Sequence, residues 1–95
     1  MELTIQHKEN DRRGVFLIGS KSGIVSELTY SKKDQKILII DHTETKIPEE
    51  GKGYASKLVA HTVNYARDKG YKIEPLCPFA EVQFDKHPEY RDVLA

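Results

Sequence analysis

The sequence contains one cysteine, no tryptophan and no long apolar run. A single cysteine cannot form a disulfide within the chain, which is typical of proteins from reducing compartments. No apolar stretch approaches the ~20 residues of a membrane-spanning helix, and the start of the chain lacks the basic and then apolar pattern of a secretion signal. We therefore expect a cytoplasmic protein that does not bind membranes.

The sequence also lacks an excess of charge of either sign. Fifteen basic and fifteen acidic residues cancel, and they are spread along the chain. Without a basic stripe, nucleic acids are not expected partners. His7, His61 and His87 have no metal-ligand spacing with Cys77, so we also expect no metal site.

The length of 95 residues predicts one small domain over residues 1–95. A chain of this size buries only about 60–65% of the surface that it exposes when unfolded, so its stability should be marginal. No repeat, linker or low-complexity tract divides the chain. We expect a monomer with a single hydrophobic core.

Hydrophobic periodicity predicts a largely antiparallel sheet that carries two helices. Strands are expected at residues 3–7, 13–18, 24–30, 36–42 and 71–76. Apolar residues at helical spacing predict a helix over residues 53–69. Pro78 at a first helical position predicts a short second helix over residues 78–86, which Pro88 stops. The order ββββ-α-β-α indicates an α+β fold.

Two finer expectations concern the strands. In the third strand Ile24, Leu28 and Tyr30 share one face, after a turn at residues 19–23. Strand 36–42 is apolar on both faces at its centre, which is typical of a strand buried between two layers. We therefore expect it to be the middle strand of the sheet.

A glycine-punctuated loop opens directly onto the first helix, within residues 47–58. Gly51 and Gly53 permit backbone angles closed to other residues and let main-chain N–H groups approach a ligand closely. The first turn of the helix leaves amides unpaired and adds roughly half a positive charge. The loop therefore predicts an anion site that could hold a diphosphate, flanked by Lys52, Ser56 and Lys57.

Two nucleotide-binding motifs do not fit this loop. A P-loop needs Gly-Lys-Ser/Thr four residues after its first glycine, whereas the run here is Gly-Lys-Gly-Tyr-Ala-Ser. The dinucleotide fingerprint comes closer, because Gly51 and Gly53 are followed by Glu74 about twenty residues on. That fingerprint follows its strand at once, whereas a long polar segment with Pro48 separates Gly51 from the apolar strand.

A third motif fits better. Glu50-Gly51-Lys52-Gly53-Tyr54-Ala55 resembles the coenzyme A loop of the GNAT N-acetyltransferase superfamily, Gln/Arg-x-x-Gly-x-Gly/Ala, with Glu50 in place of the expected Gln or Arg. Residues 41–44, 76–79 and 87–90 extend the similarity to the minimal, single-domain branch of that superfamily. The resemblance covers roughly residues 27–94.

The resemblance implies a protein that binds acetyl-CoA and transfers its acetyl group to an amine, on a protein or on a small molecule. Residues of the loop and of the preceding strand end would bind the cofactor: Thr43, Thr45, Glu50, Gly51, Lys52, Gly53, Tyr54, Ala55 and Ser56. The two carboxylates of Glu49 and Glu50 would repel a diphosphate, so Glu50 is expected to point away. Because only residues 8–13 separate the first two strands, the acceptor side should be open.

His42 and Cys77 are the candidate catalytic residues. His42 ends the apolar strand just before the loop, and a neutral imidazole can accept a proton from an amine. The alternative is a structural histidine at a strand end. Cys77 precedes Pro78 at a helix start, where the dipole favours a thiolate, and the resemblance places the bound thioester near it. The alternative is a small buried hydrophobic residue.

Two other functional classes remain open on the sequence. The first is a module that binds coenzyme A without turnover, which Glu50 and the absence of a carboxylate among Leu38, Ile39 and Ile40 would favour. The second is an interaction domain in which the glycine loop only caps the helix.

Overall fold

The computed structural model describes residues 4–20 and 23–95. Its elements are, in chain order, β1 (Ile5–Glu9), β2 (Arg13–Ser20), β3 (Gly23–Lys33), β4 (Ile37–Thr45), a 3₁₀ helix η1 (Ile47–Glu49), α1 (Tyr54–Lys69), β5 (Lys72–Pro75), α2 (Pro78–Lys86) and a second 3₁₀ helix η2 (Pro88–Val93). The predicted α+β fold and its ββββ-α-β-α order are confirmed. Lys21 and Ser22 of the predicted turn, and Leu3 of the first predicted strand, lie outside the described residues.

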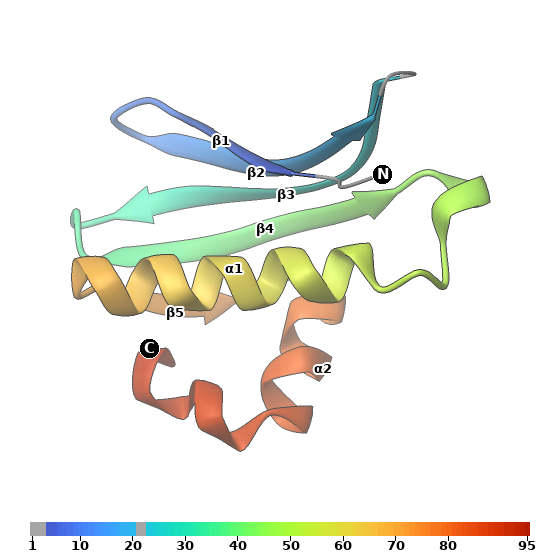
Figure 1. Ribbon diagram of the computed structural model, residues 1–95. Helices are drawn as coiled ribbons and strands as arrows, with labels where there is room; N and C mark the ends of the chain where they lie inside the picture. Colours follow the sequence, from blue (N-terminus) through green and yellow to red (C-terminus); the bar gives the residue numbers. More distant parts are fainter. Residues whose placement is uncertain (1–3, 21–22) are drawn as a thin grey trace.

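The five strands form one mixed sheet in the order β1-β2-β3-β4-β5. Neighbours from β1 to β4 are antiparallel, whereas β5 pairs with β4 in parallel, as expected when a helix connects two strands. In Figure 1, α1 runs along the sheet below β4 and in front of β5, and α2 with the C-terminal segment lies below them. The sheet, α1, α2 and η2 enclose one core.

The expectation for strand 36–42 was wrong in two respects. The middle strand is β3, and β4 lies second from an edge. Leu38 and Ile40 are buried against the helices, but Ile37 and Ile39, which alternate with them, are only half-buried. Among the described residues no helix packs on that second face. Ile24 is likewise 43% exposed, although Leu28 and Tyr30 of the same strand are buried.

Helix α1 supplies one side of the core. It begins after Gly53 and ends before Gly70, whose left-handed backbone (φ 75°) terminates the helix as the sequence predicted. One stripe of α1 is buried against the sheet: Leu58, Val59, Thr62, Val63 and Ala66. Thr62 satisfies its hydroxyl by donating to the Leu58 carbonyl at 2.8 Å. No helix of the described residues has the length and apolar character that a membrane span requires.

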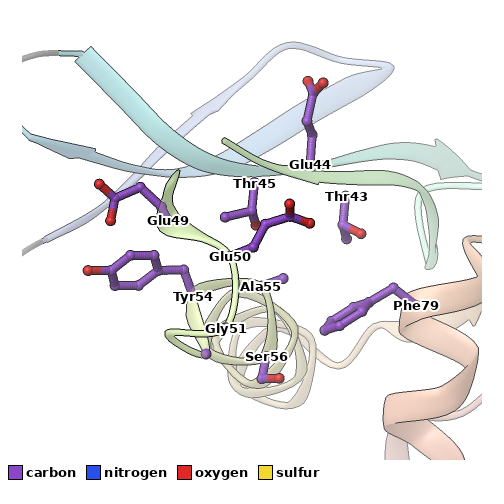
Figure 2. Close-up of a pocket in the computed structure, with 11 residues that line it drawn as sticks. Thr43, Glu44, Thr45, Glu49, Glu50, Gly51, Tyr54, Ala55, Ser56 and Phe79 are labelled. Carbon is purple, nitrogen blue, oxygen red and sulfur yellow. The ribbon is translucent and has the colours of Figure 1, made fainter. Parts of the chain in front are cut away.

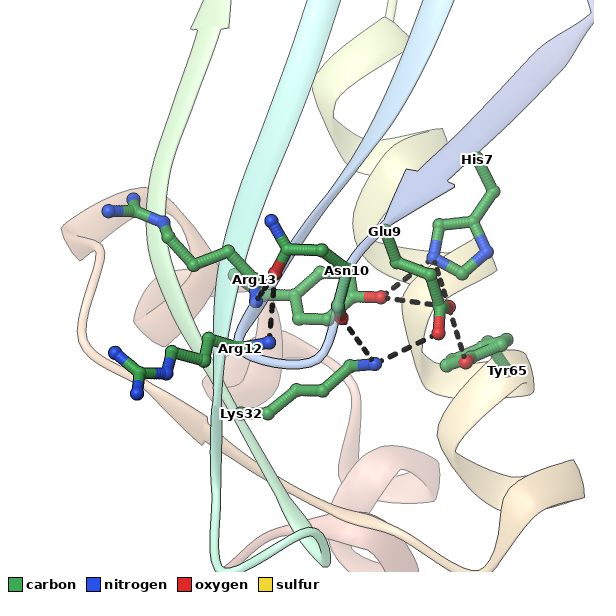
Figure 3. A network of polar contacts seen from close by, with 8 residues as sticks. His7, Glu9, Asn10, Arg12, Arg13, Lys32 and Tyr65 are labelled. Atoms are coloured by element: carbon green, nitrogen blue, oxygen red, sulfur yellow. Dashed lines mark hydrogen bonds and ion pairs between the residues drawn. The ribbon is translucent and has the colours of Figure 1, made fainter.

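A polar network fastens β1 to β3 and α1 around the carboxylate of Glu9 (Figure 3). Lys32 and the Tyr65 hydroxyl donate to Glu9, each at 2.9 Å. The ring of His7 lies 3.1 Å from the same carboxylate and 2.7 Å from the Tyr30 hydroxyl, through Nε2 in both contacts. These bonds tie the edge strand to the core.

The Gly14→Ala substitution tests the packing under this network. Gly14 pairs with Tyr30, and a Cβ atom at Gly14 would overlap the buried Tyr30 ring. We expect the substitution to lower the free energy of unfolding by about 1–3 kcal/mol, because the ring cannot move without losing its bond to His7. Gly19→Ala on the same strand is the control, since its Cβ would meet only the Gly23 carbonyl at 3.7 Å. Equal urea midpoints for the two variants would contradict this account.

The pH dependence of stability tests the charges in the network. Burial lowers the pKa of His7 below 6.5 despite the nearby Glu9 carboxylate, so below pH 6.5 the unfolded chain binds a proton more readily. The hydrogen bond from Lys32 lowers the pKa of Glu9 below 4.5. Burial acts in the opposite direction, and the hydrogen bond from Tyr65 adds to the lowering. Both groups therefore stabilise the fold at neutral pH and lose that contribution as the pH falls, His7 first.

Urea unfolding at a series of pH values measures this slope. The His7→Gln variant should lose part of the decline that begins near pH 6.5, whereas His42→Gln, at an exposed position, should keep it. A His7→Gln slope equal to that of the unsubstituted protein would show that His7 does not cause the decline.

Candidate functional site

The loop between β4 and α1 changes direction at two glycines. Gly51 (φ 84°) and Gly53 (φ 81°) both adopt the left-handed region, where a side chain costs roughly 1–2 kcal/mol. A Cβ added to either glycine would meet no atom within 4 Å. The space beside the loop is therefore open to a ligand.

Gly53 also caps the start of α1. The first helical bond of this turn runs from the Lys57 N–H to the Gly53 carbonyl at 3.0 Å, and no side chain caps the helix. The amides of residues 54–56 therefore lie at the positive end of the helix dipole without a side-chain acceptor. This arrangement attracts an anion.

A cavity of about 550 Å³ lies against this helix start, between the end of β4 and α2 (Figure 2). Its lining comes from the β4 end, the loop, the first turn of α1 and one residue of α2: Thr43, Glu44, Thr45, Glu49, Glu50, Gly51, Gly53, Tyr54, Ala55, Ser56 and Phe79. In Figure 2 the Phe79 ring extends from α2 toward the start of α1. Cavities of this size hold cofactor-sized ligands.

The side-chain charges around the cavity are mostly negative. Glu44, Glu49 and Glu50 contribute carboxylates to its lining. Lys52 is not part of the lining and binds the Glu49 carboxylate at 2.7 Å, which raises the pKa of the lysine. Any attraction for an anion must therefore come from backbone N–H groups and the helix dipole.

Strand β4 extends beyond its neighbour β5 at the cavity. Pairing with β5 ends at Ile40 and Pro75, and the Cys77 N–H adds one last bond to the Ile40 carbonyl at 3.1 Å. Residues 42–45 of β4 then pair with β3 alone. The two parallel strands thus separate where the cavity begins.

Cys77 lies at this parting and is the residue before α2. It is 7% exposed, and its Sγ lies 3.4 Å from Oγ1 of Thr43. Burial raises the pKa of the thiol, but hydrogen bonds from the Thr43 hydroxyl and from the N–H groups of Ala80, Phe79 and Thr43 outweigh it, so the net pKa is lowered. The structure thus stabilises a thiolate in a buried position.

His42 lies on the opposite side of β4 from Cys77. A register shift opposite Thr29 and Tyr30 places His42 against Thr29, while Thr43 faces the buried side with Leu28. The His42 side chain is exposed, and Cys77 is buried. The structure therefore does not bring the two candidate catalytic residues together.

Eight of the nine residues expected to bind the cofactor line the cavity, and Lys52 is the exception. Glu50 lines the cavity, so the expectation that it points away was wrong. The sequence did not single out Glu44 or Phe79 as lining residues, although both lie within motifs noted above. Within residues 4–20 and 23–95, no three His, Cys, Asp or Glu side chains gather to hold a metal ion.

Comparison with known families gives one clear match. The model of a family described as GCN5-related N-acetyl-transferase matches residues 15–93. No curated protein matches the chain significantly.

Solved structures with the same fold include acetyltransferases. The solution structure of a GCN5-like protein from Staphylococcus aureus is 30% identical, with a TM-score of 0.68 over 95% of this chain and 87% of that one. Ribosomal-protein-alanine N-acetyltransferase from Brucella melitensis biovar Abortus 2308 is 16% identical (TM-score 0.64, 90% of this chain, 64% of that one). An aminoglycoside N-acetyltransferase in complex with CoA is 12% identical (TM-score 0.59, 86% and 60%).

Proposed function

We propose, because this chain belongs to the GCN5-related N-acetyltransferase family, that it binds acetyl-CoA and transfers the acetyl group to an amine. The family membership confirms the resemblance seen in the sequence. The observation that carries the proposal is the open, left-handed glycine loop at the start of α1, which borders the cavity.

The residues around the cavity fit acetyl-CoA. Gly51 and Gly53 leave open space where a side chain would otherwise stand, so a diphosphate can approach the backbone closely. The amides of residues 54–56 can donate to its oxygens. Thr43 and Thr45 border the part of the cavity next to the parting of β4 and β5, where a pantetheine chain can pass.

Catalysis in this proposal is direct transfer to the amine. Acetyl-CoA supplies an acetyl group that is already activated as a thioester. His42, on the open face of β4, accepts the proton of the attacking amine as a general base. As the new C–N bond forms, the C–S bond of the thioester breaks, and coenzyme A leaves as a thiolate that takes up a proton from solvent. Direct transfer is preferred to a route through Cys77, because a thioester on Cys77 would be nearly isoenergetic with acetyl-CoA.

The acceptor is proposed to be an accessible amine, such as a protein lysine or N-terminus, or a small amine. Only residues 10–12 connect β1 to β2, so no helix walls that side of the sheet. Val15, Thr29 and Ile39 on this face are half-buried at most. An open face suits an acceptor that is itself part of a larger surface.

One observation favours a second candidate, a module that binds coenzyme A without turnover. His42 and Cys77 lie on opposite sides of β4, and neither lines the cavity. A binding module needs the glycine loop but no assembled acid or base.

Binding is tested with two glycines that flank α1. Gly53→Ala and Gly70→Ala both force a side chain into the left-handed region, so each should cost stability by roughly 1–2 kcal/mol. Only Gly53→Ala should weaken acetyl-CoA binding, about tenfold or more, because its methyl group stands where the diphosphate approaches. Backbone amide shifts during titration with acetyl-CoA measure both affinities. Unmoved amides of Gly51, Gly53 and Ala55 at millimolar ligand in the unsubstituted protein would refute the site.

Turnover is tested with single variants of the two candidate residues. In direct transfer, His42→Ala should lose about 10²–10⁴-fold in rate with amine acceptors, while Cys77→Ala should still turn over. If the acetyl group instead moves to Cys77, incubation without amine should add one acetyl mass, which hydroxylamine removes and Cys77→Ala abolishes. Binding without adduct or turnover across lysine peptides and small amines would favour the second candidate.

A further inference from the structure

Thr43 lies where the wall of the cavity meets the buried thiol. It lines the cavity, and its Oγ1 atom is 3.4 Å from Sγ of Cys77. The backbone N–H of Thr43 also contributes to lowering the pKa of the Cys77 thiol. One residue of β4 thus offers two donors to the same atom.

The direction of the Thr43 N–H follows from the parting of the strands. Beyond Ile40 the side of β4 that had paired with β5 has no strand partner. On that side, where a strand would otherwise accept its bond, the Thr43 N–H instead favours the Cys77 thiolate and lowers the pKa of the thiol.

Helix α2 holds the sulfur from the other direction. The N–H groups of Phe79 and Ala80, at the start of this helix, also lower the pKa of the thiol. Phe79, like Thr43, also lines the cavity. Two residues that hold the sulfur thus form part of the cavity wall, and the sulfur lies directly behind that wall.

We infer that Thr43 is a positioning residue: its hydroxyl holds the Cys77 sulfur behind the cavity wall, and a ligand that reaches Thr43 changes the reactivity of that sulfur. The second half of this inference rests on the proposed function, in which the ligand is acetyl-CoA. A thioester carbonyl next to Thr43 competes with the sulfur for the same donors. Occupancy of the cavity and thiol reactivity are then coupled through one side chain.

The physical effect of the hydroxyl can be isolated by substitution. Burial alone opposes the thiolate, and donated hydrogen bonds offset it, with the Thr43 hydroxyl the largest of these contributions. Thr43→Val keeps the β-branched shape that a strand favours and removes only the donor. Thr43→Ser keeps the donor and removes a methyl group.

The test is the pH profile of Cys77 alkylation by iodoacetamide, followed by mass. Cys77 is the only cysteine in the sequence, so every alkylation event reports on it. Thr43→Val should slow alkylation at pH 7 roughly tenfold and move the profile to higher pH, because a hydrogen bond to an ion is lost. Thr43→Ser should keep the original profile. Thr29→Val is the matched control, because it deletes a hydroxyl on the neighbouring strand that donates to the His42 carbonyl.

Three results would overturn the inference. The first is a Thr43→Val profile equal to that of the unsubstituted protein. The second is a Thr43→Ser profile that moves as far as that of Thr43→Val, which would make the hydroxyl irrelevant. The third is unchanged alkylation when amide shifts show that acetyl-CoA is bound. If acetyl-CoA does not bind, the proposed function fails, while the first two comparisons still decide the role of Thr43.

Discussion

The extension of β4 beyond its partner β5 is the constraint on which the site depends. Parallel pairing stops at Ile40, but β4 continues to Thr45 along β3. A strand that ended with β5 would remove Thr43 and Thr45 from the wall of the cavity and leave Cys77 without the Thr43 hydroxyl. Because β4 continues, Thr43 and Thr45 face the start of α1 across an open space instead of another strand. The glycine loop then only has to return the chain to α1.

The helices pack on one face of the sheet, and this arrangement supports the geometry of the site with few residues. A chain of 95 residues can cover only part of its surface, and α1, α2 and η2 pack around one face of the sheet. The second face keeps Ile39 and Thr29 half-buried and His42 exposed. At the edge of the sheet the Glu9 network stabilises β1 in place of a covering helix, because the Tyr65 hydroxyl of α1 donates to Glu9 of β1. The short chain thus explains both why few helices cover the sheet and why one of its faces is accessible.

The sequence predicted the elements well because their periodicities are local. Alternation located the five strands of the described residues, helical spacing located α1, and Pro78 located the start of α2. Gly51 and Gly53 located the loop. The error about strand 36–42 has a clear cause, because an apolar pattern on both faces does not reveal whether both faces are covered. The Thr43–Cys77 contact joins residues 34 apart, and the Tyr65–Glu9 bond joins residues 56 apart. No local pattern contains such pairs.

The charges around the cavity decide how an anion must be held there. Glu44, Glu49 and Glu50 repel a diphosphate, and the nearest loop lysine, Lys52, is neutralised by Glu49. Long-range attraction by side chains is therefore weak, and binding must depend on short, directional bonds to backbone N–H groups. Such bonds form only if the backbone can be approached closely, which is what the bare left-handed glycines at 51 and 53 permit. The geometry of the loop must then supply the anion binding to which an arginine or glutamine at position 50 would otherwise contribute.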